Sequence, residues 1–180
     1  MNRLRRVRRL IALPLLAAAL APCVARAVEE AELKAAIVIN ILLFVEWPAA
    51  APPEQGGALR LCVGPNSSLR EAFKPLDRRE VRGRVLELRE LAPGDDGRRP
   101  CHAVFIDAAD RTRLAATLRA QRAAGALVLS DDPDAPRDST AIVLERVGNK
   151  IAFDVNLQPV RHARLQLSSK LLRLARVVRE

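Results

Sequence analysis

The segment Cys101-His-Ala-Val-Phe-Ile-Asp107 has an unbroken apolar core, follows a proline and is closed by an aspartate. A short apolar run that contains Val, Phe and Ile is typical of a strand buried on both faces, and such strands belong to parallel sheets covered by helices. Upstream, Leu59-Arg-Leu-Cys-Val-Gly64 has the character of a second short strand. We therefore predict a sheet built around residues 101–107.

Strand and helix patterns alternate along the rest of the chain, as expected for a largely parallel sheet with helices on its faces. The order predicts an α/β fold in three layers, with a largely parallel sheet of about six strands flanked by helices and a C-terminal antiparallel hairpin. The predicted strands are 59–63, 85–89 (as an edge strand), 101–107, 126–130, 142–147 and 150–155. The predicted helices are 29–47, 67–75, 111–124, 156–164 and a last one from 168 or 169 to the C-terminus.

Local signals set the expected helix ends. Ser68-Leu-Arg-Glu71 has the spacing of a capping box, and Asp110 is placed to cap the helix that follows it. Gly125 would end that helix. Pro48 would end the first helix at Trp47, because a residue before proline disfavours the helical conformation.

The first helix is apolar around most of its circumference, so we expect it to be buried between the sheet and a second body, with a partner protein as one candidate. Asn40 in its middle is expected as a hydrogen-bonded core amide. The apolar residues of the helix are Leu33, Ala36, Ile37, Leu43, Phe44 and Trp47 on one stripe, and Val38, Ile39, Ile41 and Leu42 off it.

The first 27 residues predict a cleaved secretion signal. Five arginines precede the apolar run 10–20, and Ala25-Arg-Ala27 has the small-x-small pattern of a cleavage site. The run is short for a membrane span. Lipidation at Cys23, in Leu20-Ala-Pro-Cys23, and export by the twin-arginine route stay open as alternatives. With cleavage, residues 28–180 remain as a single periplasmic domain.

The net charge does not predict a nucleic-acid partner. The formal charge is +9, but residues 1–27 contribute six arginines and no acidic residue, which leaves 24 basic and 21 acidic residues in the remainder. The chain has no Tyr, one Trp and four Phe, so side chains that stack on bases are scarce. We therefore expect no nucleic-acid binding.

After cleavage, Cys62 and Cys101 are the only cysteines. They lie on candidate neighbouring strands of a protein in an oxidising compartment, which favours a disulfide between them. The alternative is two separate buried thiols.

The sequence offers little catalytic chemistry: it contains no GxSxG, SxxK or HExxH motif. His102 should point away from the face that carries its neighbour Cys101, and His162 lies among arginines. Asp107 and Asp110 fall at the carboxyl edge of the sheet, where α/β folds bind ligands, but they are also ordinary strand-end and helix-cap residues. The acidic loop 131–134 is more typical of a surface turn than of a cation site. We expect no catalytic residue, no metal and no cofactor.

Several segments, taken together and in order, resemble the YfiR-like family of periplasmic proteins. The resemblance covers essentially all of residues 28–180. It is carried by Leu33-Lys-Ala-Ala-Ile37, Asn40, Phe44-Val-Glu-Trp-Pro48, Leu61-Cys-Val-Gly64, Val81-Arg-Gly-Arg84, Cys101-His102, Phe105-Ile106, Ile151-Ala-Phe-Asp-Val-Asn-Leu157 and Leu167-Ser-Ser-Lys-Leu-Leu-Arg-Leu-Ala-Arg176.

The resemblance implies a secreted regulator rather than an enzyme. The best understood members bind the periplasmic sensor domain of an inner-membrane diguanylate cyclase and hold it inactive, redox stress relieves this inhibition, and the proteins tend to dimerise. The resemblance thus implies a role in cyclic-di-GMP signalling and a homodimer, and the Cys62–Cys101 disulfide fits the redox behaviour of the family.

The chain departs from the family pattern at three places. Ile39 and Ile41 stand where aromatic residues usually flank Asn40, a second cysteine pair near the late hairpin is missing, and Asp138-Ser-Thr-Ala141 replaces a glycine-rich start. These departures bear on the identity of the partner and on redox sensing, and leave the expected fold unchanged.

The partner surface is expected at the C-terminal margin. Asp154 should face away from Phe153 and be available to a partner, and Val160 and His162 follow on a short exposed helix. Val177 and Val178 would lie in the last helical turns, either against the partner or packed on the first helix. The alternative function is a small-molecule receptor that uses the carboxyl edge of the sheet. Exposed apolar residues on the first and last helices would favour the inhibitor, and a deep pocket near Asp107 and Ser130 would favour the receptor.

Overall fold

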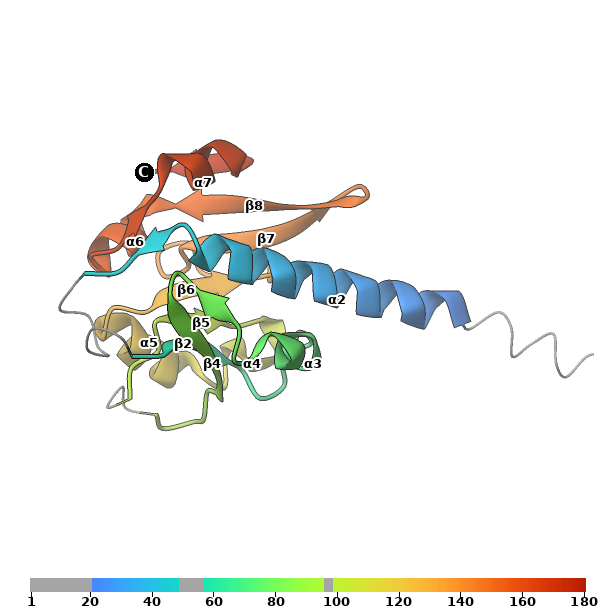
Figure 1. The fold of residues 1–180 in the computed structure, drawn as a ribbon, viewed down its shortest axis with the longest axis horizontal. Helices are drawn as coiled ribbons and strands as arrows, with labels where there is room; N and C mark the ends of the chain where they lie inside the picture. The colour runs from blue at the N-terminus through green and yellow to red at the C-terminus, as the bar shows by residue number, and fades with distance from the viewer. Residues whose placement is uncertain (1–20, 49–56, 96–98) are drawn as a thin grey trace, which may run out of the picture.

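The computed structural model describes residues 21–48, 57–95 and 99–180, and the side chains from residue 29 onward. An eight-stranded sheet runs through the molecule in the order β10-β8-β7-β6-β5-β2-β4-β3, with helices packed on it (Figure 1). The strands are β2 (Leu59–Val63), β3 (Glu80–Val81), β4 (Arg84–Glu90), β5 (Ala103–Phe105), β6 (Leu127–Ser130), β7 (Ile142–Val147), β8 (Lys150–Asn156) and β10 (Val177–Arg179).

The centre of the sheet is parallel, as predicted. Strands β4, β2, β5, β6 and β7 all pair in parallel. The predicted hairpin is β7–β8, which pairs antiparallel from Ile142↔Val155 to Val147↔Lys150. Two short strands at the margins raise the strand number above the predicted six: β3 pairs antiparallel with β4, and β10 pairs parallel with β8. Strand β3 pairs only with Arg84 and Val85, and no other described strand pairs with the outer side of β4, so residues 86–89 lie at the sheet edge as predicted.

Helices lie on both faces of the sheet, which gives the three predicted layers. The long helix α2 (Ala21–Leu42) packs with α3 (Arg70–Phe73) and the 3-10 turn η1 (Lys74–Leu76) on one face. The other face carries α4 (Ala108–Arg111) and α5 (Ala115–Ala123), and their core includes Leu114 and Leu118. Gly125, at φ +90°, follows α5 in the left-handed conformation expected of a glycine after a helix end.

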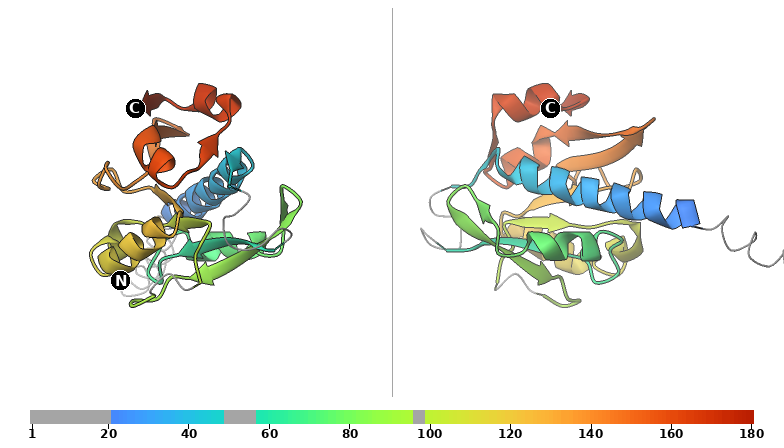
Figure 2. Two further views of the ribbon diagram at one scale, coloured as in Figure 1. Left: turned by 90° about the vertical axis from the view of Figure 1, so that its left-hand side faces the viewer. Right: turned by 45° about the vertical axis from the view of Figure 1, so that its right-hand side comes forward.

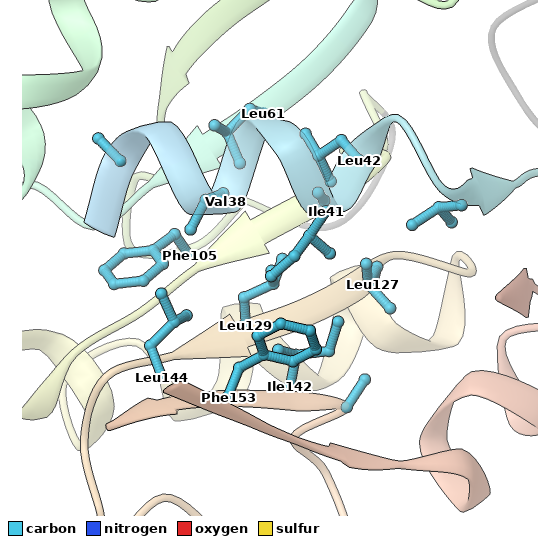
Figure 3. Packing of buried hydrophobic residues seen from close by; sticks show 14 of the residues in the cluster. Val38, Ile41, Leu42, Leu61, Phe105, Leu127, Leu129, Ile142, Leu144 and Phe153 are labelled. Atoms are coloured by element: carbon cyan, nitrogen blue, oxygen red, sulfur yellow. The ribbon is translucent and has the colours of Figure 1, made fainter. Parts of the chain in front are cut away.

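The sheet curls around α2, so the helix packs against both the parallel strands and the hairpin (Figure 2). Its residues Val38, Ile41 and Leu42 point into one cluster with side chains of β5 and β6 and of the β7–β8 hairpin (Figure 3). The hairpin of the chain itself thus supplies part of the second body that we expected over this helix. Asn40 is exposed rather than buried, so its prediction as a core amide is wrong.

The helix α2 ends five residues earlier than predicted. Phe44 N–H donates to Ile41 O at 2.9 Å, and the chain then forms the short strand β1 (Val45–Glu46). This strand pairs antiparallel with β9 (Gln166–Leu167) and buries Val45 fully. Pairing with a distant segment overrides the local helical pattern here, and Pro48 is not the residue that ends the helix.

The predicted cap of the helix 67–75 is wrong. Leu69, not Ser68, precedes α3, and its side chain makes no capping hydrogen bond. The backbone N–H of Ser68 donates to Asp107 Oδ2 at 2.8 Å instead. A contact between the β2–α3 and β5–α4 loops therefore replaces the local capping box.

The predicted helix 111–124 is split into α4 and α5. Asp110 lies inside α4 and is fully buried, so it does not cap a helix. Its carboxylate accepts the backbone N–H and the side-chain amide of Asn66, both at 2.7 Å. The contact joins the first turn of the predicted helix to the β2–α3 loop, and three residues separate that turn from α5.

The last predicted helix is also shorter than expected. It is α7 (Ser169–Leu174), after which Ala175 is extended, at φ −65° and ψ 140°. Val177 and Val178 then form β10 beside β8. The leucines recur at helical spacing, which extended the predicted helix over the two valines. Adjacent β-branched residues favour a strand instead.

Candidate functional site

The C-terminal margin of the molecule, which we define as residues 150–180, carries every residue predicted to bind a partner. It forms one end of the molecule, with α7 lying along β8 (Figure 1). Two capped helices shape it. Asn156 accepts Gln158 N–H at 3.0 Å at the start of α6 (Leu157–His162), and Ser168 accepts Leu171 N–H at 3.3 Å at the start of α7.

Asp154 is engaged within the chain rather than free for a partner. Arg176 Nε and Nη2 each donate to its carboxylate at 2.9 Å, and Arg179 Nη1 donates at 3.4 Å. These hydrogen bonds and charges of Arg176 and Arg179 lower the pKa of Asp154, although partial burial opposes them. Arg176 also pairs with Glu145 of β7. The cluster ties β10 to the hairpin.

Val160 is not on the surface. Only 2% of it is exposed, because α6 turns this residue into the core beside Leu165 and Leu171. The prediction that Val160 lies exposed is therefore wrong. His162, two residues later, is exposed as expected.

The exposed apolar residues of the margin lie on α7 and β10. Val178 is 40% exposed, Val177 is half-buried, and Leu174 is 67% exposed. Leu174 was not singled out from the sequence. Lys170, Arg173 and Leu174 are spaced three and four residues apart on the helix surface, but Leu174 is also three residues from the buried Leu171, so helical spacing alone did not distinguish it from a core leucine.

The predicted disulfide between Cys62 and Cys101 is present, with the two Cα atoms 5.9 Å apart. It joins Cys62 in β2 to Cys101, which lies two residues before β5. Cys62 and Cys101 are 0% and 2% exposed and pack under Leu114 and Leu118. The bond is sealed from solvent beneath α5, so a reductant must open this face before it can reach the sulfur atoms.

His102 lies buried at the amino ends of β2, β4 and β5. Arg60 N–H donates to its Nδ1 at 3.0 Å, Arg84 Nη2 lies 2.8 Å from its Nε2, and Trp47 packs edge-on at 5.8 Å. Both ring nitrogens thus face N–H donors, and a second ring proton would have no acceptor. Burial, followed by the charges of Arg84 and Arg60, lowers the pKa of His102 to about 3. The ring is a neutral core element at neutral pH.

The carboxyl edge of the sheet is filled by the side chains of the chain itself. The strand order reverses between β2 and β5, which is where open α/β sheets place a ligand crevice. Asp110 and Asn66 occupy that point, and a Cβ atom on Gly64 would meet Asp110 Oδ2 at 2.4 Å. Asp107 Oδ1 is buried there without a hydrogen-bond partner among the described residues. The crevice at this edge is therefore filled by protein side chains, and Asp107 Oδ1 is the acceptor atom that remains unpaired there among the described residues.

The acidic loop after β6 is neutralised by basic side chains. Lys34 of α2 donates to Asp131 at 2.8 Å, and Arg111 pairs with Asp132 at 2.5 Å. Asp132 also accepts Asp134 N–H at 2.9 Å. Within the described residues, no group of three or more His, Cys, Asp or Glu side chains is placed to hold a metal ion.

A family model described as YfiR/HmsC-like matches residues 31–176. The chain belongs to this family. Its members are periplasmic regulatory proteins of cyclic-di-GMP signalling rather than enzymes, and they act on a partner membrane protein. The family resemblance that the sequence motifs predicted is thereby confirmed.

One solved structure, a conserved domain protein from Vibrio cholerae O1 biovar eltor, is similar in fold with a TM-score of 0.54 and 9% sequence identity. The alignment covers 83% of this chain and 60% of that one, so this YfiR/HmsC-like chain spans about three fifths of its length. No curated protein matched the chain. Of the helices in residues 21–48, 57–95 and 99–180, none combines the length and the apolar character of a membrane span.

Proposed function

We propose that this protein is a periplasmic inhibitor that binds the sensor domain of an inner-membrane diguanylate cyclase, or of a related signalling protein, and lowers cyclic-di-GMP production. The observation that carries the proposal is the YfiR/HmsC-like match over residues 31–176, which includes the second half of α2, all strands of the sheet except β10, and most of the C-terminal margin. A regulator of this kind needs a binding surface and no catalytic site.

Exposed apolar side chains on the first and last helices support a protein partner. Leu33 of α2 is 46% exposed, Leu43 just after α2 is 38% exposed, and Leu174 of α7 is 67% exposed. Large apolar residues that remain in water next to charged ones are typical of interaction sites. The plugged carboxyl edge, in contrast, gives the alternative function of a receptor at that edge no support.

Charge is concentrated at the same margin. Residues 150–180 contain seven basic and two acidic residues, whereas residues 28–149 contain 17 basic and 19 acidic residues. Arg176 and Arg179 are used inside the chain, but Arg164, Lys170 and Arg173 are exposed and form no ion pair with any described residue. We infer that the partner presents acidic residues around an apolar centre, which Leu174 and Val178 would contact.

We propose that Asp154, His162, Val177 and Val178 remain part of this surface. Asp154 acts there by fixing Arg176 and Arg179, while Val178 and His162 are accessible directly.

A homodimer is a further proposal. Light scattering of the purified protein should give twice the mass of the mature chain, and a monomer at micromolar concentration would contradict it.

The test is a pull-down from solubilised inner membrane with the mature protein as bait. We expect it to recover a membrane protein with a diguanylate cyclase domain. Leu174→Asp should reduce the recovery at least tenfold, because it places a carboxylate in the apolar centre of the surface. Val147→Asp is the matched control, since Val147 is 46% exposed at the hairpin tip, away from that surface. Recovery of no signalling protein, or equal recovery by both variants, would contradict the proposal.

A further inference from the structure

A cleft of about 330 Å³ opens between α5 and α6, away from the plugged carboxyl edge. The two helices lie on the same side of the molecule (Figures 1 and 2). The cleft lies between α5, which packs over β5 and the disulfide, and α6, which follows β8, next to the amino ends of β6 and β7. Its floor is formed by Ala126, Val128 and Ala141, which are small or β-branched and almost fully buried.

The walls of the cleft carry hydrogen-bond donors and positive charge. Arg119 and Arg122 lie three residues apart on α5 and therefore share one face of that helix. His162 of α6 stands on the other side, beside Pro159. No Asp or Glu lines the cleft. The side chains thus combine an apolar floor with a cationic rim.

No acidic side chain among the described residues forms an ion pair with either arginine. Arg122 Nη2 donates to Asp138 O at 3.3 Å, a backbone carbonyl that leaves the guanidinium charge uncompensated. Arg119 is exposed and forms no ion pair with the part of the chain that the structure describes. Guanidinium groups bind carboxylates and phosphates through paired hydrogen bonds, and two of them at one rim favour an anion.

We propose that this cleft binds a small organic anion, with its carboxylate or phosphate held by Arg119 and Arg122 and its apolar part on the floor of Ala126, Val128 and Ala141. The volume is at the lower end of the range for small-molecule sites, which fits a ligand of about one aromatic ring. The cleft borders the proposed partner surface at His162. Arg119, Arg122 and the floor residues are not part of that surface, so the inference stands whether or not the protein inhibits a cyclase.

The proposal is tested by titrating the full, oxidised protein with benzoate and phenyl phosphate in a buffer free of phosphate and sulfate. Benzyl alcohol and benzylamine are the neutral and cationic counterparts. Amide resonances of residues 119–128, 139–141 and 160–163 should shift with both anions and with neither counterpart. Shifts confined to other residues, no saturation at millimolar anion, or equal binding of benzyl alcohol would each overturn the proposal.

Two substitutions make the test residue-specific. Arg119→Gln and Arg122→Gln should each weaken benzoate binding about tenfold, and together abolish it, because each removes a charged donor while keeping a polar side chain. Arg113→Gln is the control: Arg113 is also an exposed arginine beside α5, but it does not line the cleft. Unchanged affinity in the double variant, or an equal loss in the control, would show that the arginines of the cleft do not hold the anion.

Discussion

At the scale of single residues, burial decides what a side chain can do. His102 has the residue type of a catalytic base, but it is 2% exposed and faces two N–H donors. Its low pKa keeps the ring neutral and makes it a structural group. Leu174 has the residue type of a core side chain, yet it is the most exposed large apolar residue of the described chain. Neither assignment follows from residue type alone.

His102 makes the free energy of unfolding depend on pH between its pKa in the folded chain and its pKa in the unfolded chain. Its pKa is about 3 in the folded chain and near the ordinary histidine value of 6.5 in the unfolded chain, so only the unfolded chain binds a proton between these values. Acid therefore favours unfolding. From pH 7 to pH 5 this residue alone should lower the free energy of unfolding by about 2 kcal/mol.

Urea unfolding at both pH values, with wild type and His102→Gln, measures this contribution. The variant should be less stable at pH 7 and should lose most of the difference between the two pH values. An equal pH dependence in the two proteins would show that His102 is protonated in the fold.

Val160 provides a second residue-scale prediction, because its burial makes it unsuitable as a surface probe. Val160→Asp should lower the free energy of unfolding by about 3 kcal/mol or more, since it buries an unpaired carboxylate. His162→Asp is the matched control on the same helix and should cost less than about 1 kcal/mol. Thermal melting of both variants checks this, and a stable Val160→Asp protein would contradict the burial of this residue.

At the scale of elements, local patterns predicted the interior of the fold and failed at its margins. The central strands and the β7–β8 hairpin were predictable because each is a continuous apolar or alternating run. The end of α2, the split between α4 and α5, and β10 were not predictable, since pairing with segments far along the chain determines them. The disulfide was predictable because both cysteines lie on or next to strands that the patterns placed side by side.

The disulfide should act as a structural bond rather than as an exposed switch. The chain-entropy model gives a loop of this length about 4 kcal/mol of stability, and its sulfur atoms are sealed beneath α5. Native protein should show no alkylatable thiol, and dithiothreitol should reduce the bond only as fast as the protein opens, with low urea accelerating the reaction. Two alkylatable thiols in native protein, or a reduction rate independent of urea, would contradict this.

At the scale of the whole molecule, the sequence predicted the fold class and the family, whereas most of the proposed partner surface could be identified only from the structure. The charged and apolar groups of the margin come together only because β10 returns to β8 and α7 lies beside it. Of the five predicted surface residues, Val160 is buried, Asp154 is held by arginines, and His162, Val177 and Val178 are at least partly accessible.

The position of the mature N-terminus is a prediction at the same scale. Cleavage after Ala27 should leave a chain that begins at Val28 and keeps nearly all of the residues of α2 that pack on the sheet. Intact-mass analysis of periplasmic extract checks this. A diacylated chain that begins at Cys23 would instead indicate lipidation and attachment to a membrane.

The central claim is that the protein represses a cyclase through its C-terminal margin, and intracellular cyclic-di-GMP measures this most directly. In cells that carry the cognate cyclase, deletion of the gene should raise cyclic-di-GMP several-fold, and wild type or Val147→Asp should restore the low level. Leu174→Asp should fold normally by circular dichroism and fail to restore it. A level that the deletion leaves unchanged would contradict repression, and full repression by Leu174→Asp would contradict the proposed surface.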